Sequence, residues 1–193
     1  MVIRVVPEGD ERDKDVANGI RYAVDNGAKV INMSFGKGYS QDKKAVDEAV
    51  KYAMAHNVLI VHAAGNGNEN LDSIKNYPSR TYAGGGQAQA WLEVGASGPN
   101  WARDLKASFS NYGKNSVDVF APGVQILSTI TGSKYEKYDG TSMAAPVVSG
   151  LAAILREYYP KLTAVQVKEI IMKSVVPFSA SCIRHAARQA GSN

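Results

Sequence analysis

The residue best placed for covalent chemistry lies in the run Gly140-Thr141-Ser142-Met143-Ala144-Ala145-Pro146. This run puts Ser142 at the start of an apolar segment with helical spacing. A hydroxyl at a helix N-terminus lies among unpaired N–H groups at the positive end of the helix dipole, where developing negative charge is stabilised. The small neighbours leave room for a substrate carbonyl. We therefore predict that Ser142 is a nucleophile for acyl transfer.

A second segment offers the hydrogen-bond donor that such a reaction needs. Ala63-Ala64-Gly65-Asn66 follows the apolar run Val58–Val61, which is too short for a helix and reads as a buried strand. A sharp turn after that strand lets Asn66 offer its side-chain amide to a negatively charged oxygen, with the N–H of Ser142 as the second donor. The sequence thus predicts an oxyanion-binding pair made of Asn66 and Ser142.

These segments resemble the motifs of the subtilisin-like serine proteases, or subtilases (peptidase family S8). All seven positions of residues 140–146 match the G-T-S-M-A-x-P run that carries the family's nucleophile, and residues 63–66 match its A-A-G-N oxyanion segment. Val30–Gly36 is similar to the V-I-N-M-S-x-G strand whose exposed edge pairs with the substrate backbone. The resemblance covers about residues 1–175. It implies a serine endopeptidase that hydrolyses polypeptides through an acyl-enzyme on Ser142.

The resemblance also implies the walls of a substrate cleft. The implied substrate-binding residues are Ser34, Phe35, Gly36, Ala64, Gly65 and Thr141. Pairing through backbone groups gives affinity for any extended peptide, whereas side-chain pockets give selectivity. We therefore expect broad specificity.

Two family motifs are missing from the sequence. A subtilase triad runs Asp, His, Ser along the chain, with the Asp in a D-T/S-G turn and the His in an H-G-T-H helix, both upstream of the strand that corresponds to Val2–Val6. No Asp here precedes Thr-Gly or Ser-Gly, and none of the 3 histidines has the flanking Gly and Thr. Without a base, Ser142 keeps an unactivated hydroxyl. We interpret residues 1–193 as a partial subtilase domain that needs an upstream Asp- and His-bearing segment and is inactive alone.

Other polar residues near these motifs have simpler interpretations. His62 lies four residues before Asn66 on a buried strand pattern, and we interpret it as a hydrogen-bonded core histidine rather than a base. His56 reads as a helix C-terminal residue, and Asp139 as a loop carboxylate.

Two rival function classes remain to be weighed. A non-catalytic peptide-binding or assembly module would keep the edge at Ser34–Gly36 and use no chemistry, and the upstream sequence would discriminate it from an enzyme. An unrelated α/β hydrolase or nucleotide-binding domain fails on motif, because Ala144 replaces the second glycine of G-x-S-x-G and no dinucleotide fingerprint follows a strand.

Composition and charge limit the classes of partner that we expect for this chain. The 22 basic and 18 acidic residues are interspersed, which argues against nucleic acid, and no apolar run approaches the length of a membrane span. Cys182 is alone, so no internal disulfide forms. We assign no cofactor or metal, although Asp10, Glu11, Asp13 and the polar run 66–72 stay open as calcium candidates. The N-terminus lacks a signal-peptide pattern, and the family resemblance implies a secreted or cell-envelope location.

The elements that must position these residues form a strand-helix alternation, which implies a parallel sheet. The resemblance sharpens this to a three-layer subtilisin-like α/β fold without the N-terminal strands that carry the Asp and His motifs. The predicted strands are Val2–Val6, Ala28–Met33, Val58–Val61, Trp91–Val94, Val117–Phe120, Gln125–Ile130 and Lys134–Tyr138. The predicted helices include Val16–Val24 and Ala45–Met54, then start at Thr141 and, with a capping box to Gln166, at Thr163.

Two further expectations concern packing and the end of the chain. The helix from Thr141 is expected to face the core with Met143, Val147, Leu151, Ile154, Leu155 and Tyr158. Gly150 within it is expected to mark close packing. Residues 176–193 read as an atypical C-terminal tail that resembles the family's final helix only loosely.

Overall fold

The computed structural model describes residues 1–6, 9–99 and 105–177 of the chain. A sheet of four parallel strands, in the order β1-β2-β3-β4, runs through its centre, and β5 and β6 form an antiparallel ribbon. The strands are β1 (Val30–Met33), β2 (Leu59–Ala63), β3 (Trp91–Ser97), β4 (Val119–Pro122), β5 (Ile126–Ile130) and β6 (Lys134–Tyr138).

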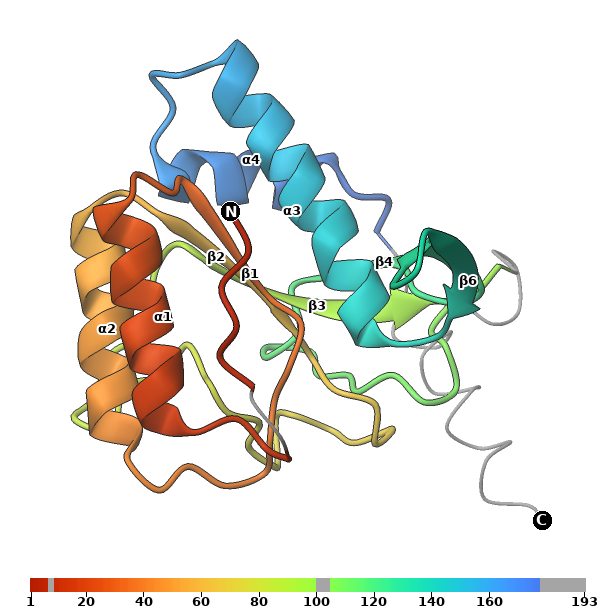
Figure 1. Cartoon of the computed structure of the whole chain (residues 1–193), viewed down its shortest axis with the longest axis horizontal. Helices are drawn as coiled ribbons and strands as arrows, with labels where there is room; N and C mark the ends of the chain where they lie inside the picture. The colour runs from red at the N-terminus through yellow and green to blue at the C-terminus, as the bar shows by residue number, and fades with distance from the viewer. Residues whose placement is uncertain (7–8, 100–104, 178–193) are drawn as a thin grey trace.

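Helices cover both faces of the sheet, so the molecule has three layers (Figure 1). The helices are α1 (Asp13–Asp25), α2 (Lys43–Ala55), α3 (Thr141–Tyr158) and α4 (Ala164–Ser174). Because side chains alternate along a strand, Leu59 and Val61 of β2 join the core beneath α3 and α4, while Ile60 joins the core beneath α1 and α2. The predicted α/β class with a mainly parallel sheet is confirmed.

Local signals in the sequence explain where several helices begin and end. Asp42 accepts a hydrogen bond from the Ala45 N–H at 3.2 Å and caps α2. Thr163 and Gln166 form the predicted capping box of α4. Gly27 follows α1 with a φ of 81°, a left-handed conformation that glycine adopts without steric cost.

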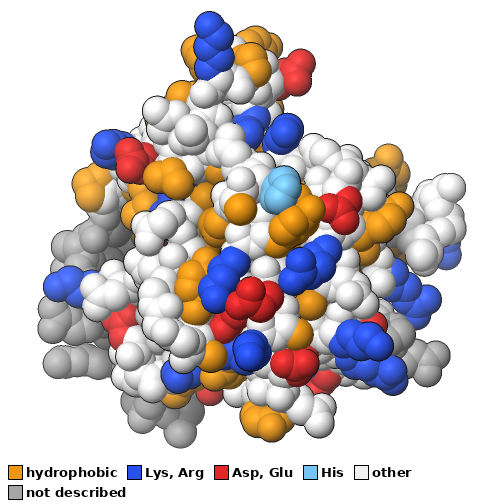
Figure 2. Space-filling model, turned by 90° about the vertical axis from the view of Figure 1, so that its left-hand side faces the viewer, with side chains coloured by type: hydrophobic (Ala, Val, Ile, Leu, Met, Phe, Trp, Pro, Cys, Tyr) orange, Lys and Arg blue, Asp and Glu red, His pale blue; other side chains and the backbone are white. Residues whose placement is uncertain are grey.

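The outer face of α1 and α2 carries charges of both signs. Figure 2 shows basic and acidic side chains interspersed over this side of the molecule. Lys43 pairs with Asp47 at 2.6 Å and Lys51 with Glu48 at 2.8 Å along α2. Within the described residues, no helix combines the length and apolar character needed to cross a membrane.

The first predicted strand is wrong. Residues 1–6 form no strand and pair with no described strand. Val5 instead packs on α1, where a Cβ added to Gly19 would lie 2.5 Å from Val5 Cγ1. A groove of about 540 Å³ is lined by Met1, Val2, Ile3 and Val5 together with residues of α1 and β1. An apolar run becomes a strand only when another strand lies beside it, and no strand of the described residues lies beside this one.

The apolar residues of Ala28–Met33 favour a buried strand, and this expectation is wrong as well. Only Met33 of β1 is buried, Val30 and Ile31 are partly exposed, and Asn32 is exposed. Among the described strands, β1 is outermost and pairs with β2 alone, so the described residues leave one of its edges and part of both faces uncovered.

The long helix α3 departs most from its expected packing. Val147, Leu151, Ile154 and Tyr158 are 46%, 46%, 57% and 77% exposed. The helix is buried instead through small residues, chiefly Ala144, Ala145, Val148 and Ala152. A Cβ on Gly150 would meet no atom within 4 Å, so the expected close packing there is wrong. The apolar spacing was real, but no described segment covers that side of the helix.

Smaller differences concern strand and chain ends. β4 begins at Val119 rather than Val117. The predicted tail, 176–193, lies outside the described residues from 178 onward, together with Cys182 and His185.

Candidate active site

Ser142 lies in the first turn of α3, next to the end of β1. Its Oγ donates a hydrogen bond to the Ser34 carbonyl oxygen at 3.0 Å, and the Ser34 Oγ donates to the Ser142 carbonyl oxygen at 2.9 Å. The hydroxyl thus lies at the start of α3, at the positive end of the helix dipole, where a negative charge is favoured.

The reciprocal contact between the two serines has a cause in the sequence. Pro146 has no N–H, so it cannot make the helical hydrogen bond to the carbonyl four residues earlier, which is that of Ser142. The Ser34 hydroxyl donates to this carbonyl instead. The proline of the motif therefore ties the start of α3 to the segment that follows β1.

Asn66 is fixed in one orientation. Its Oδ1 accepts hydrogen bonds from the Thr141 N–H and the Thr141 Oγ1, both at 2.9 Å. Thr141 Oγ1 also accepts from the Gly65 N–H at 3.0 Å. Because Oδ1 is occupied by donors, the Nδ2 end of the Asn66 amide is left to bind an acceptor, and Asn66 is exposed.

The two expected oxyanion donors lie beside one space, next to Gly140. A Cβ placed on Gly140 would lie 3.5 Å from Asn66 Nδ2 and 3.6 Å from the Ser142 N. Glycine leaves this space open, and any larger residue at 140 would place a side chain before both donors. The arrangement can bind a negatively charged oxygen next to the Ser142 hydroxyl.

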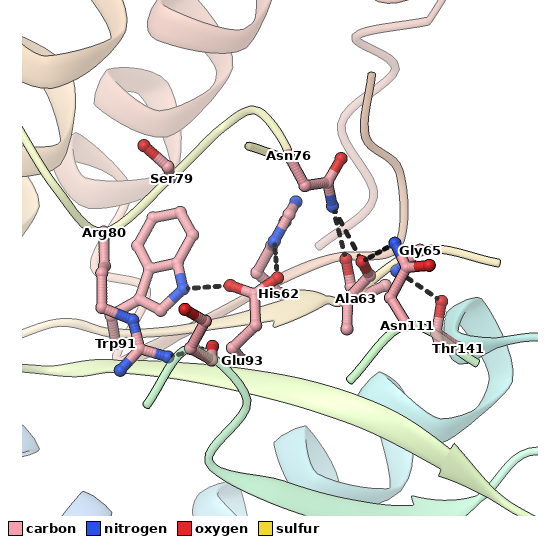
Figure 3. A network of polar contacts seen from close by, with 12 residues as sticks. His62, Ala63, Gly65, Asn76, Ser79, Arg80, Trp91, Glu93, Asn111 and Thr141 are labelled. Atoms are coloured by element: carbon pink, nitrogen blue, oxygen red, sulfur yellow. Dashed lines mark hydrogen bonds and ion pairs between the residues drawn. The ribbon is translucent and has the colours of Figure 1, made fainter. Parts of the chain in front are cut away.

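The loop that carries Asn66 is braced from below. Asn111 is buried, and its Oδ1 accepts from the Gly67 and Glu69 N–H groups at 3.0 and 2.9 Å while its Nδ2 donates to the Ala64 carbonyl at 2.8 Å. Figure 3 shows Asn111, Asn76 and Thr141 gathered around Ala63 and Gly65. The sequence alone assigns Asn111 no role, because an asparagine that holds a loop through long-range hydrogen bonds has no local signature.

The implied substrate-binding residues do not all lie at the surface. Gly36 is exposed and Ser34, Phe35 and Gly65 are partly exposed, whereas Ala64 and Thr141 are 0% and 1% exposed. The Ala64 N–H donates to the Val94 carbonyl, and its own carbonyl accepts from Asn111 and Asn76. Direct substrate contact by Ala64 and Thr141 stays a prediction, and the contacts found place both behind the surface.

No described histidine contacts Ser142. His62 is fully buried, with Nδ1 2.8 Å from Glu93 Oε1 and Nε2 2.9 Å from the Phe35 carbonyl oxygen. His56 caps the C-terminus of α2. The Asp139 carboxylate accepts from the Gln125 N–H at 2.6 Å in an exposed loop. These three groups have the structural roles expected from the sequence.

Two of the calcium candidates, Asp13 and Asp72, are engaged by protein donors. Asp13 pairs with Lys37 at 2.9 Å and accepts from Ser40. Asp72 accepts from the Ser116 Oγ at 2.8 Å and from the Lys114 N–H at 2.8 Å. Across the described ranges, no three His, Cys, Asp or Glu residues cluster as metal ligands.

Comparison with known proteins gives a consistent result. The model of the Subtilase family matches residues 1–191. The chain is 44% identical over 141 residues to the thermophilic serine proteinase of Bacillus sp. (strain AK1), covering 73% of this chain and 31% of the relative. It is 39% identical over 157 residues to the thermostable alkaline protease of Halalkalibacterium halodurans, covering 81% and 39%.

Solved structures agree with the fold. A cold adapted subtilisin-like serine proteinase superposes with a TM-score of 0.76 at 32% identity, over 92% of this chain and 60% of that one. A protease from Pseudoalteromonas arctica PAMC 21717 gives 0.77 at 30% identity, over 98% and 62%. Of the full length of the two protease relatives named above, the chain spans only 31% and 39%. With a family match over almost its whole length and the same fold in solved relatives, this chain belongs to the subtilase family of serine peptidases.

Proposed function

We propose that this chain supplies the nucleophile, the oxyanion donors and one cleft wall of a subtilisin-like serine endopeptidase. The observation that carries the proposal is the fixed Asn66 amide, whose Nδ2 lies, together with the Ser142 N, beside the space that Gly140 leaves open. A polypeptide is the proposed substrate. As a further part of the proposal, the enzyme acts in a secreted or cell-envelope setting.

The proposed reaction follows the acyl-enzyme route. Ser142 Oγ adds to the carbonyl carbon of the peptide bond as its proton passes to an imidazole, and Asn66 Nδ2 and the Ser142 N–H bind the oxyanion. The C–N bond then breaks, and the leaving amine takes the proton. Water, deprotonated by the same imidazole, hydrolyses the ester and releases the acid product.

The described residues do not supply that imidazole. Ser142 Oγ donates to Ser34, and both ring nitrogens of His62 are engaged elsewhere. We therefore propose that an upstream segment with a D-T/S-G turn and an H-G-T-H helix brings the Asp and His, and that this chain is inactive without it.

Three neighbouring features support a docking place for such a segment. β1 has an unpaired edge, the 540 Å³ groove lies beside it, and α3 presents its uncovered apolar stripe, defined as Val147, Leu151, Ile154 and Tyr158. These stripe residues are spaced by four, three and four, which puts them on one helix face. The Ser149 hydroxyl of α3 donates to Asn32 Oδ1 of β1 at 2.9 Å, so helix and strand edge are adjacent.

Fluorophosphonate labelling with mass-spectrometric mapping tests the proposal. We compare this chain alone with the completed enzyme, meaning this chain joined behind a subtilase segment that contains both missing motifs. The expected result is labelling of Ser142 only in the completed enzyme, and none after Ser142→Ala. A folded but unlabelled completed enzyme would reject Ser142 as nucleophile. Equal labelling of the chain alone would reject the need for an external base.

The rival function, a peptide-binding module without chemistry, is favoured by one observation. The Gly36 N–H and C=O have no hydrogen-bond partner among the described residues, which leaves a free edge for an extended peptide. Peptide binding by the completed enzyme without labelling or hydrolysis would favour this module over the endopeptidase.

A further inference from the structure

His62 is an unusual residue for its position. It lies in β2, the strand between β1 and β3, and is 0% exposed among Leu59, Ile60, Val61 and Ala63. Burying an imidazole costs free energy unless both ring nitrogens find partners. An apolar side chain would fill the same place without that cost, so the contacts of the ring indicate what it does.

The two ring nitrogens bind groups on opposite sides. The Phe35 carbonyl oxygen, 2.9 Å from Nε2, can only accept, so Nε2 carries a hydrogen and donates it. Nδ1 lies 2.8 Å from Glu93 Oε1, and one proton is shared there. The ring is therefore held between the sheet and the segment that follows β1.

Glu93 is itself held firmly. Its Oε2 accepts from Trp91 Nε1 at 2.8 Å, and its N–H donates to Asp118 Oδ2 at 2.7 Å. Asp118 in turn pairs with Arg80 at 2.6 Å. Figure 3 shows the run from Arg80 through Glu93 to His62. Such a chain of contacts fixes the orientation of the imidazole.

Phe35 needs a donor from a side chain because the sheet ends before it. The parallel pairing of β1 with β2 stops at the pair Met33 and His62. On one side, Ser34 is tied to Ser142, and on the other, Lys37 exchanges two backbone hydrogen bonds with Tyr77 at 2.9 and 2.8 Å. Phe35 lies between these anchors, and its carbonyl is bound by His62.

The direction of this carbonyl matters for the neighbouring residue. In an extended segment, the polar backbone groups of successive residues point to opposite sides. With the Phe35 carbonyl turned inward, the Gly36 N–H and C=O are left on the cleft side, where no described residue binds them. We propose that His62, oriented by Glu93, is a positioning residue that presents the Gly36 backbone to a bound peptide. The proposal rests on the proposed function of the cleft.

The test compares two reactions of the completed enzyme. An extended peptide uses the Gly36 edge, whereas fluorophosphonate labelling of Ser142 does not. In His62→Leu we expect kcat/KM for the peptide to fall about tenfold, mainly through KM, while the labelling rate stays within about twofold. His62→Gln, whose amide can donate to the Phe35 carbonyl, is expected to recover most of the loss. Equal losses in both reactions, or no loss in either, would overturn the proposal.

Two further measurements separate a loss of positioning from a loss of stability and from a failure of the proposed function. Leu59→Ala removes buried volume from the opposite face of the same strand, in the core beneath α3 and α4, whereas Phe35 packs on the core beneath α1 and α2. It therefore reports destabilisation alone and is expected to leave KM unchanged. If the wild-type completed enzyme neither labels nor cleaves, the proposed function fails. The positioning role is then read from the Gly36 amide resonance in NMR spectra, which is expected to shift in His62→Leu and to stay in place in Leu59→Ala. An unshifted Gly36 amide in His62→Leu would refute it.

Discussion

The site has two sides: the loop side, around Asn66 and Asn111, and the β1 side, around Ser34 and Gly36. They differ in how many of their polar and apolar groups have partners within this chain. On the loop side, the buried polar residues Asn111, Thr141 and Lys106 all have hydrogen-bond partners. On the β1 side, a strand edge, a groove and the apolar stripe of α3 are uncovered. The one buried side-chain polar atom without a partner among the described residues, Glu11 Oε1, lies just before α1, which lines that groove.

This difference separates two parts of the proposed chemistry. The groups that would bind the oxyanion are positioned by contacts within the chain and need no other segment. The base has no such support, and the surface that borders Ser142 on the β1 side has the properties of an interface. Exposed apolar side chains in a continuous patch mark such surfaces. We infer that the nucleophile half of the site is preformed and that the base half is supplied by docking.

The largest expected effect comes from breaking the oxyanion pair on the loop side. Asn66→Asp keeps the Oδ1 that accepts from Thr141 but replaces the Nδ2 donor by a carboxylate oxygen. We expect kcat of the completed enzyme to fall roughly 100- to 1000-fold or more, the cost measured for such a donor in a subtilisin. Asn18→Asp, on the exposed face of α1, is the matched control. A loss below about tenfold would contradict the role given to Asn66.

A large loss of stability is expected from the brace beneath the same loop. Lys106 is 4% exposed, and its Nζ donates to Asn68 Oδ1 at 2.8 Å and to the Ala107 and Ser110 carbonyls at 3.0 Å. Burial lowers the pKa of this ammonium. Lys106→Met leaves these oxygens without a donor, so we expect the free energy of unfolding in urea to drop by about 3 kcal/mol.

The control for this change is Lys161→Met, at an exposed position, with an expected effect within about 0.5 kcal/mol. If both variants unfold at the same urea concentration, the loop side is not held by Lys106 and the contrast between the two sides weakens.

An intermediate effect is expected from the stripe on the β1 side. Leu151 is 46% exposed, so Leu151→Lys leaves the stability of this chain nearly unchanged. When the Asp- and His-bearing segment is added as a separate polypeptide, we expect its apparent affinity to fall about 10- to 100-fold, since burying one such side chain stabilises by about 1.5–3 kcal/mol. The readout is the Ser142 labelling rate against segment concentration. Leu127→Lys, an exposed apolar site on β5, is expected to bind the segment normally.

The same contrast explains which features were predictable from the sequence. β2, β3 and the capping box at Thr163 and Gln166 follow from local patterns, and the segments themselves decide them. Val2–Val6 and the apolar stripe of α3 were misjudged because their pattern assumes a covering partner that the described chain lacks. Pattern alone reports that a face is apolar, and it does not report what lies against it.

The candidate site, too, was only partly predictable from the sequence. Ser142 and Asn66 stand out through dense motifs, and the structure brings them together. The bracing role of Asn111 and the Glu93 contact of His62 depend on residues tens of positions apart. Without the pairing of β2 with β3, nothing in the sequence brings His62 beside Glu93.

The smallest expected effect lies where the two sides meet. Asp13 opens α1 and binds Lys37, just past the Gly36 edge. Burial alone would raise the pKa of Asp13, but hydrogen bonds from the Asp42 N–H, Lys37 and Ser40 outweigh it and keep the pKa below its ordinary value of 3.8. A carboxyl with a lowered folded-state pKa contributes stability above its unfolded-state value, and that contribution disappears as the pH falls through the folded-state value. We therefore expect wild type to lose stability below about pH 4 more steeply than Asp13→Asn, with urea unfolding measured across that range. Parallel curves of unfolding free energy against pH for the two proteins would show that Asp13 does not hold the start of α1 against the cleft edge. Asp13 would then not mark the boundary between the loop side and the β1 side.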